Sequence, residues 1–423
     1  MTAQPEAPAG TPSAPAALAE PTTPVRARWI ALLFGANLAV WMGFFTPIQF
    51  LLPNQVQEIV GEAGKEAMLG WVTGLGALVA LIANPLAGAL SDRTSGRFGR
   101  RHPWTLLGAL LGAGGLVLLS AQQTILGVAL CWAGVQLCLN AMLASLTAAV
   151  PDRVPVSQRA AVAGWVGIPQ PLGVVLGAIL VTMLVAGTRP GYLAVAAAIV
   201  LLTPAFVLAT RDDPLPRAAR PPFRLRAFWI SPRQHPDFAW AFATRFLVQL
   251  GNSLGTLYLL FFLQDAVGLA PGEEADNGLM VLILIYTAGI ISTTVIAGRI
   301  SDRSGKRKGH VLVSGLVMAV AAVILAVWPT WTGSMVAAAI LGAGYGIYVS
   351  VDQALITQVL PAVSGRAKDL GIINIANSAP QVLGPAIAAP VVAGLGGYPV
   401  LYVLTAVVTL LGGVLIYQVR SVR

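Results

Sequence analysis

A run of polar side chains recurs within an otherwise apolar segment, residues 238–264. Arg245, Gln249, Asn252 and Thr256 stand at i, i+4, i+7 and i+11, so a helix would place all four on one face. An arginine at the centre of a membrane-spanning helix costs about 2.5–3.5 kcal/mol on insertion scales. Arg245 could offset part of this cost by extending towards the membrane surface. We favour a role in a polar cavity, because ionisable residues inside a membrane usually mark functional sites.

Asp352 is the other charged side chain that the sequence places well inside a span and that we expect to be buried, within segment 333–359. It follows Tyr345 and Tyr348 on the same predicted helix face. Two roles are open for it, the counter-ion of Arg245 or a proton acceptor. A position in water near the end of the segment is the alternative.

Amide side chains inside further apolar segments complete the candidate cavity lining. An amide both donates and accepts hydrogen bonds, so linings rich in amides and poor in charge suit neutral hydroxylated ligands. For the single amides of the first and fourth segments, hydrogen bonding between helices is at least as good an explanation. The amides in question are Asn37, Gln49, Gln136, Asn140, Gln170, Asn374, Asn377 and Gln381.

The amino-acid composition indicates which kind of secondary structure positions these polar side chains. Of the 423 residues, 56% are hydrophobic and only 10% are charged, against about 25% charged in ordinary soluble domains. We therefore predict an all-α membrane protein with twelve transmembrane helices in two six-helix bundles. The apolar segments of spanning length are 28–52, 67–90, 104–122, 124–149, 160–186, 190–210, 238–264, 277–298, 311–329, 333–359, 367–395 and 398–418.

Five regions follow from these segments. We expect a disordered tail at 1–27, bundles at 28–210 and 238–418, a linker at 211–237 and a short tail at 419–423. The tails and the linker should lie in the cytoplasm.

The basic residues follow one side of this predicted topology. All but three of the 26 lysines and arginines fall in the tails, the linker or every second loop, and the three exceptions are Lys65, Arg189 and Arg245. Positively charged loops stay in the cytoplasm, so both termini should be cytoplasmic in a multi-pass protein of the cell membrane. The opposite loops are acidic, with Glu58, Glu62, Glu66, Asp265, Glu273, Glu274 and Asp276. The net charge of +9 thus reflects topology, and we expect no nucleic-acid partner.

Two loops repeat at one offset. Ser91-Asp92-Arg93 and Ser301-Asp302-Arg303 are 210 residues apart, as are Val150-Pro151 and Leu360-Pro361. Two homologous halves that both start on the same side are related by an axis along the membrane normal.

The loop after the second segment resembles the signature loop of the major facilitator superfamily. Its sequence is similar to that of the glycoside–pentoside–hexuronide cation symporters and sucrose carriers. At the superfamily level the resemblance covers residues 28–418. It implies alternating access and a conformational gate in which Asp92 pairs with Arg93, Arg97 or Arg101, with a weaker copy at Asp302 and Arg303. The loop motif comprises Gly88, Asp92, Arg93, Arg97, Gly99, Arg100 and Arg101.

The chain departs from the cation symporters in one respect. They often bind the coupling ion through acidic residues in the first six helices, and here segments one to six contain no Asp or Glu. A coupling proton or sodium ion therefore stays open, and no other cofactor is expected.

Enzyme signatures are absent. Gly251-Asn-Ser253-Leu-Gly255 matches a nucleophile elbow only as a string, because it lies within a predicted span and not on a strand-to-helix turn. We expect a monomeric, non-enzymatic transporter in the lipid bilayer that moves a small polar organic substrate, a sugar or glycoside. The alternatives are a drug or metabolite exporter working as a proton antiporter, and a membrane sensor on the same fold that does not transport.

Overall fold

A computed structural model describes residues 21–155, 158, 162, 165–185, 187–219, 231–304, 307–359 and 366–420. Every regular element in this part of the chain is a helix, as predicted. The first half contains α1 (Ala27–Thr46), the π-helix η2 (Pro47–Leu51), α2 (Leu52–Val60), α3 (Lys65–Asp92), α4 (His102–Leu119), α5 (Ile125–Arg153), α7 (Pro169–Ile179), the π-helix η3 (Leu180–Leu184) and α8 (Thr188–Ala209).

The second half has the same number of long helices. It contains α9 (Pro236–Leu257), α10 (Leu259–Asp265), α11 (Glu273–Ser304), α12 (Arg307–Val327), α13 (Trp331–Val359), α14 (Arg366–Gly394) and α15 (Gly397–Leu415), followed by a 3-10 turn, Ile416–Gln418. Within the described residues, ten helices are long and apolar enough to cross a membrane, and α9 with α10 makes an eleventh as one span bent by 40°. α14 coincides with the remaining predicted segment, 367–395.

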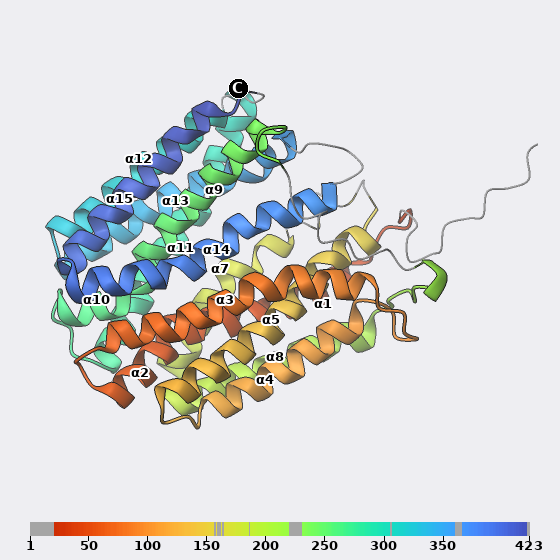
Figure 1. Ribbon diagram of the computed structural model, residues 1–423, viewed down its shortest axis with the longest axis horizontal. Helices are drawn as coiled ribbons and strands as arrows, with labels where there is room; N and C mark the ends of the chain where they lie inside the picture. Colours follow the sequence, from red (N-terminus) through yellow and green to blue (C-terminus); the bar gives the residue numbers. More distant parts are fainter. Residues whose placement is uncertain are drawn as a thin grey trace, which may run out of the picture.

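The two halves pack their helices in the same order. The neighbours α3–α5, α4–α5, α4–α8, α1–α8 and α1–α7 in the first half correspond to α11–α13, α12–α13, α12–α15, α9–α15 and α9–α14 in the second. The halves meet through α3 against α14 and α7 against α11. Figure 1 shows the first half, red to yellow-green, beside the second, green to blue. The structural order thus repeats, as the two loop copies indicate.

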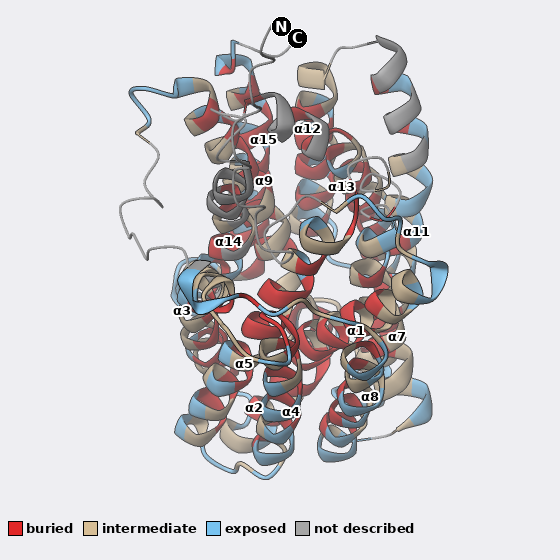
Figure 2. Cartoon of the chain, turned by 90° about the vertical axis from the view of Figure 1, so that its right-hand side faces the viewer, coloured by how far each residue is buried: buried red, intermediate tan, exposed pale blue. Residues whose placement is uncertain are grey.

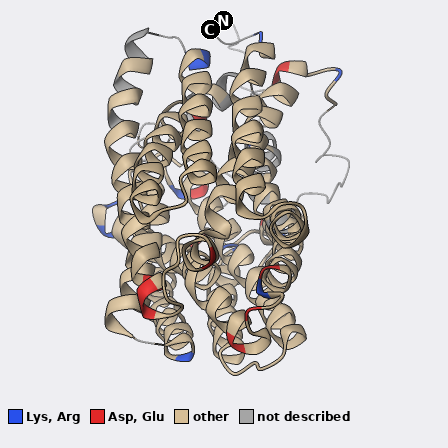
Figure 3. Cartoon of the chain, turned by 90° about the vertical axis from the view of Figure 1, so that its left-hand side faces the viewer, with Lys and Arg blue, Asp and Glu red and all other residues tan. Residues whose placement is uncertain are grey.

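The outer faces of the helices are apolar, as expected for a protein surrounded by lipid. Large apolar side chains such as Leu208, Leu201 and Leu126 are exposed, and the exposed residues gather on outward helix faces and at helix ends (Figure 2). Charged residues are sparse along the helices, as Figure 3 shows. A soluble protein would place polar residues on these outer faces.

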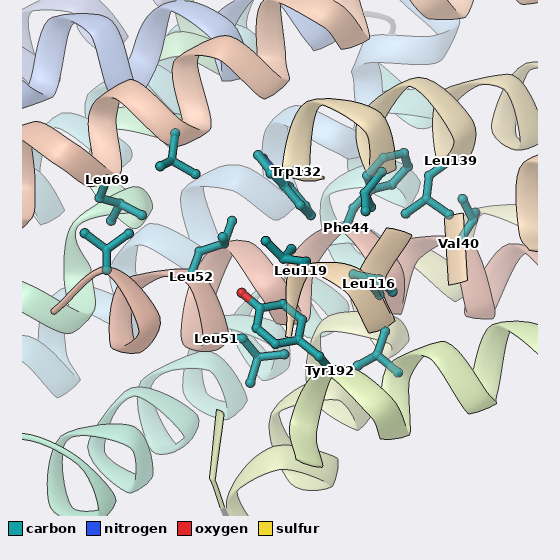
Figure 4. Close-up of a cluster of buried hydrophobic side chains, with 14 of the residues drawn as sticks. Val40, Phe44, Leu51, Leu52, Leu69, Leu116, Leu119, Trp132, Leu139 and Tyr192 are labelled. Carbon is teal, nitrogen blue, oxygen red and sulfur yellow. The ribbon is translucent and has the colours of Figure 1, made fainter. Parts of the chain in front are cut away.

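The interior of the first half is a dense apolar cluster. Trp132 of α5, with no exposed surface, packs among Leu116, Leu119, Leu52 and Leu69, which come from three other helices (Figure 4). Small residues let the helices come this close. A Cβ added at Gly108 of α4, for example, would lie 2.6 Å from the Cys138 carbonyl oxygen of α5.

Two ends of the bundle matter below. We call the basic end the one where α3 and α5 finish and α4 begins, with Arg100, Arg101 and Arg153. The far end is the opposite one, with the turn before Lys65 and the end of α10 at Asp265. In Figure 1 the far end, with α2 and α10, lies on the left.

Candidate functional site

Arg245 is the centre of a polar network inside the second half. Its Nη1 atom lies 3.1 Å from Oδ2 of Asp352 on α13, and its Nε donates to Oδ1 of Asn377 on α14 at 2.6 Å. Only 5% of Arg245 and 8% of Asp352 is exposed. Arg245 therefore does not extend to the surface, and Asp352 is not solvated. The Tyr348 hydroxyl donates to the other Asp352 oxygen at 2.7 Å, so both carboxylate oxygens have partners.

Gln249, one turn along α9, extends the network. Its Nε2 donates to Oδ1 of Asn377 at 3.0 Å, and its Oε1 accepts from the Tyr345 hydroxyl at 3.0 Å. Asn377 thus accepts from two residues of α9 and ties α14 to it. Gln249 and Asn377 are only half-buried, so this edge of the network is less enclosed than the Arg245–Asp352 pair.

Aromatic rings of α11 and α13 form the next layer. The Tyr286 ring stacks on Tyr345 with centroids 6.2 Å apart, and its hydroxyl donates to Oδ1 of Asn252 at 3.0 Å. Close helix approach makes this stack possible, because a Cβ at Gly342 would clash with the Tyr286 carbonyl oxygen. Tyr286 was not among the predicted site residues. Only the position of α11 beside α13, which one sequence does not reveal, brings it in.

The predicted amides of the first half form local contacts. Asn37 donates to the Leu33 carbonyl of its own helix at 2.9 Å. Asn140 donates to the Gln136 carbonyl and side chain, and accepts from Asn84 of α3 at 3.4 Å. Of these bonds, only the one from Asn84 to Asn140 joins two helices, and none of them connects Asn37, Gln136 or Asn140 to the network around Arg245.

Three other predicted residues, Gln49, Gln170 and Gln381, form no hydrogen bond to that network among the described residues. Gln49 and Gln170 are half-buried on η2 and α7, and the buried Oε1 of Gln49 has no partner. Gln381 is exposed on α14. The side chain of Asn374 lies outside the described residues.

At the basic end, Arg101 forms an ion pair with Asp92. Its Nη2 lies 2.5 Å from Oδ1 of Asp92, while its Nε lies 2.8 Å from Oδ2 of Asp152 at the end of α5. Arg100 holds the other Asp152 oxygen at 2.7 Å. Of the three arginines suggested for Asp92, the structure thus pairs Arg101. Asp152 is an additional member that sequence reasoning did not assign to the gate.

The other motif residues have distinct surroundings. Arg97 is exposed, and its guanidinium lies 4.7 Å from the centre of the Phe98 ring. Arg93 is half-buried. A Cβ at Gly88 would meet nothing within 4 Å, so packing does not require a glycine there. The side chains of Asp302 and Arg303 fall outside the described part of the chain.

The start of the linker docks onto this loop. The Asp212 carboxylate accepts from the backbone N–H groups of Arg101 and His102, at 2.5 and 3.0 Å, at the start of α4. Gly99 has a φ of +82°, and a Cβ there would clash with Asp212, so this position requires glycine. Asp213 adds an ion pair with Arg153 at 2.6 Å. Sequence reasoning took this segment for a plain linker.

At the far end, Lys65 connects the halves. Only 1% of it is exposed, and its Nζ lies 2.7 Å from Asp265 of α10 and 2.8 Å from Glu62. The hydrogen bond from Lys65 lowers the pKa of the exposed Glu62 carboxyl below its ordinary value. Tyr398 of α15 donates to the second Asp265 oxygen at 2.7 Å. Lys65 departs from the charge bias of the sequence, and this departure is the signal that could have marked it as a contact residue.

Two further bonds cross between the halves at this end. Asn54 of α2 donates to both Asp276 oxygens of α11, at 3.0 and 3.2 Å. The Tyr258 hydroxyl, where α9 bends into α10, donates to the Glu66 carbonyl at 2.9 Å. Several polar contacts therefore join the two halves at the far end.

Repeated six-helix halves around a buried polar network define a membrane transporter of the major facilitator type. The chain belongs to the MFS/sugar transport protein family, whose model matches residues 64–398. It is also similar to the general alpha-glucoside permease of Schizosaccharomyces pombe, with 28% identity over 166 residues. That match covers 35% of this chain and 28% of the permease.

Solved structures share the fold at low identity. A POT family transporter in complex with a thioalcohol-conjugated peptide has a TM-score of 0.73 and 13% identity, covering 92% of this chain and 95% of that one. The human organic anion transporter MFSD10 has a TM-score of 0.68 and 16% identity, covering 93% and 100%. The nucleoside transporter NupG has a TM-score of 0.69 and 13% identity, covering 92% and 100%. These ligand classes differ, so the fold does not select a substrate.

Proposed function

We propose that this protein carries a neutral sugar or glycoside across the cell membrane by alternating access. The observation that carries the proposal is the network of Arg245, Gln249, Asn377 and Tyr345, inside the second half. The family description and the partial similarity to a glucoside permease support the same substrate class.

The chemistry of the network suits hydroxyl groups. Gln249 and Asn377 carry both donors and acceptors, and Arg245 adds donors. Half-buried polar groups within a span need a partner or water, so we place a solvated cavity beside Gln249, Asn252 and Asn377. Tyr345 and Tyr286 supply stacked rings close to these amides, and aromatic faces are suitable surfaces for the apolar side of a sugar ring.

We place two of the predicted residues of the first half on the opposite wall of this cavity. Gln49 and Gln170 are the strongest candidates, because both are half-buried and Gln49 has an unbonded oxygen. Asn374 and Gln381 stay assigned to the cavity by their helical spacing with Asn377.

Two polar clusters are proposed as gates. The Lys65–Asp265 and Asn54–Asp276 contacts close the far end, whereas Arg101, Asp92 and Asp152 cluster within the first half at the basic end. Charge-assisted bonds of this kind are strong when they form and directional enough to define a state. We therefore assign the structure to the state closed at the far end.

Orientation follows from charge. We propose that the basic end is cytoplasmic, so that the far end faces the exterior and both termini lie inside. A reporter active only in the cytoplasm, fused after Arg423, should be active; activity only in an exterior reporter at this site would reverse the assignment.

The decisive experiment for function is uptake by purified protein in liposomes. Saturable accumulation of a radiolabelled glucoside, competed by unlabelled glucoside, is the expected result. Binding without flux would favour the sensor, and transport confined to amphipathic non-sugars would favour the exporter. Arg245→Gln should lower glucoside uptake more than tenfold, because it removes the ion pair and the bond to Asn377.

A further inference from the structure

The candidate site holds one positive and one negative group in direct contact. Arg245 and Asp352 are both more than nine-tenths buried and lie 3.1 Å apart. The other buried lysines and arginines in the described part of the chain, Lys65, Arg100 and Arg101, lie at helix ends or next to them. The site as a whole is therefore electrically balanced, and this balance depends on a single carboxylate.

Arg245 keeps donors that these contacts do not use. Its Nε bonds to Asn377 and its Nη1 to Asp352, whereas a guanidinium has five N–H donors. The planar donor array also matches a carboxylate or phosphate in two-point geometry. Without Asp352, this buried arginine would be an anion-binding group.

We propose that Asp352 sets the charge of the substrate, neutralising Arg245 so that the site accepts an uncharged hydroxylated ligand and rejects an anionic one. This inference rests on the proposed function, because it takes the network for the substrate site. A ligand carboxylate beside Arg245 would also lie close to the Asp352 carboxylate. Like charges brought together in a dehydrated site repel strongly.

The opposite wall offers an anion no charged partner. Gln49 and Gln170, the residues of the first half that we assign to it, are both uncharged. Tyr348 holds Asp352 at its Oδ1, which keeps the carboxylate against Arg245. The charge balance thus depends on the position of α13, which carries Asp352, relative to α9, which carries Arg245.

The test compares matched ligands that differ by one charge. Binding of a methyl glucoside and of the methyl glucuronide with the same ring is measured by equilibrium binding to the purified full chain. The wild-type protein should prefer the glucoside. Asp352→Asn should shift the ratio of the two affinities at least tenfold towards the glucuronide, because Asn keeps the size of the side chain and removes its charge.

Two further variants isolate the charge. Asp352→Glu keeps the negative charge beside Arg245, so the preference for the glucoside over the glucuronide should persist. The double variant Arg245→Gln/Asp352→Asn should lose the glucuronide preference again. Arg245→Gln alone leaves a negative site and should favour the cationic methyl glucosaminide over the glucoside, which keeps a readout should Asp352→Asn fail to fold.

The outcomes separate this inference from the sugar assignment. Glucoside binding with an unchanged ratio in Asp352→Asn and in Arg245→Gln would overturn the charge role and leave the sugar site intact. Should no sugar bind, nicotinamide and nicotinate serve as a second matched pair. A gain for nicotinate in Asp352→Asn would then support the charge role and reject the sugar. The charge role would be overturned if neither pair of ligands showed a change that depends on charge.

Discussion

The Lys65 ammonium of α3 lies 2.7 Å from the Asp265 carboxylate of α10, and this ion pair joins the two halves of the chain at the far end. Glu62 lies at nearly the same distance from Lys65, at 2.8 Å, but belongs to the same half. The two carboxylates thus provide a matched comparison, since only one of them can hold the halves together.

Breaking the Lys65–Asp265 pair should open the far end. In a background with Cys131→Ser and Cys138→Ser, a cysteine introduced as Thr256→Cys reports access to the end of α9 that lies towards the far end. Asp265→Asn should raise its rate of labelling from the far side several-fold, because the pair that closes this end is lost. Glu62→Gln should leave the rate near its starting value.

A charge swap distinguishes the contact from a general loss of structure. Lys65→Asp/Asp265→Lys places the same two charges in reversed order and should restore slow labelling. Fast labelling in the swap as well as in Asp265→Asn would show that the pair itself does not hold the end closed.

Removing Arg245 should destabilise the fold as well as transport. Arg245→Gln leaves Asp352 buried without a cation, and breaking one side of a buried pair costs about 3–5 kcal/mol. Arg245→Gln/Asp352→Asn removes both charges and should recover most of that loss. Unfolding midpoints of the purified proteins in detergent test this. Additive losses in the double variant would mean that the two residues are not coupled.

The fold follows from the sequence because hydrocarbon imposes simple rules. Segments of spanning length each became a long helix, although predicted segment 238–264 bends at Tyr258. Partner choice was harder, since the sequence offers three arginines to Asp92, and the structure shows Arg101, just before α4, in contact with it. Lys65 begins α3 and Asp265 ends α10, so the two residues lie in different halves and 200 residues apart in the chain. Only the three-dimensional packing of the halves brings such residues together.

The linker contact at Asp212 should protect the linker from proteolysis. Asp212→Ala removes an acceptor for two N–H groups at the start of α4, and losing a helix cap costs about 1 kcal/mol. Trypsin should then cleave between α8 and α9 several times faster. Asp213→Ala breaks only the partly exposed pair with Arg153, a type worth about 0–1 kcal/mol, and should change the rate little. Equal rates in both variants would reject a specific role for Asp212.

Close packing at Gly342 should be required for the network. Gly342→Ala forces α13 away from the Tyr286 carbonyl of α11, which separates Tyr286 from Tyr345 and should lower both the unfolding midpoint and glucoside uptake. Gly74→Ala, where a Cβ meets nothing within 4 Å, provides the control and should be neutral. Loss of uptake in both variants would point to a general effect of substituting glycine in these helices.

Sodium should not drive uptake. Protein cation sites hold the ion with several oxygen ligands, and both Asp352 oxygens are already bonded, to Arg245 and to Tyr348. The other cation-binding candidates named by the resemblance, acidic residues in the first six spans, are missing from the sequence. Uptake into liposomes should therefore be equal with an inward sodium gradient and with potassium replacing sodium on both sides. An imposed pH gradient in the same liposomes then separates proton-coupled from uncoupled transport, because only the former accumulates substrate above its equilibrium level. Accumulation that depends on sodium would contradict this assignment and would require a cation site away from Asp352.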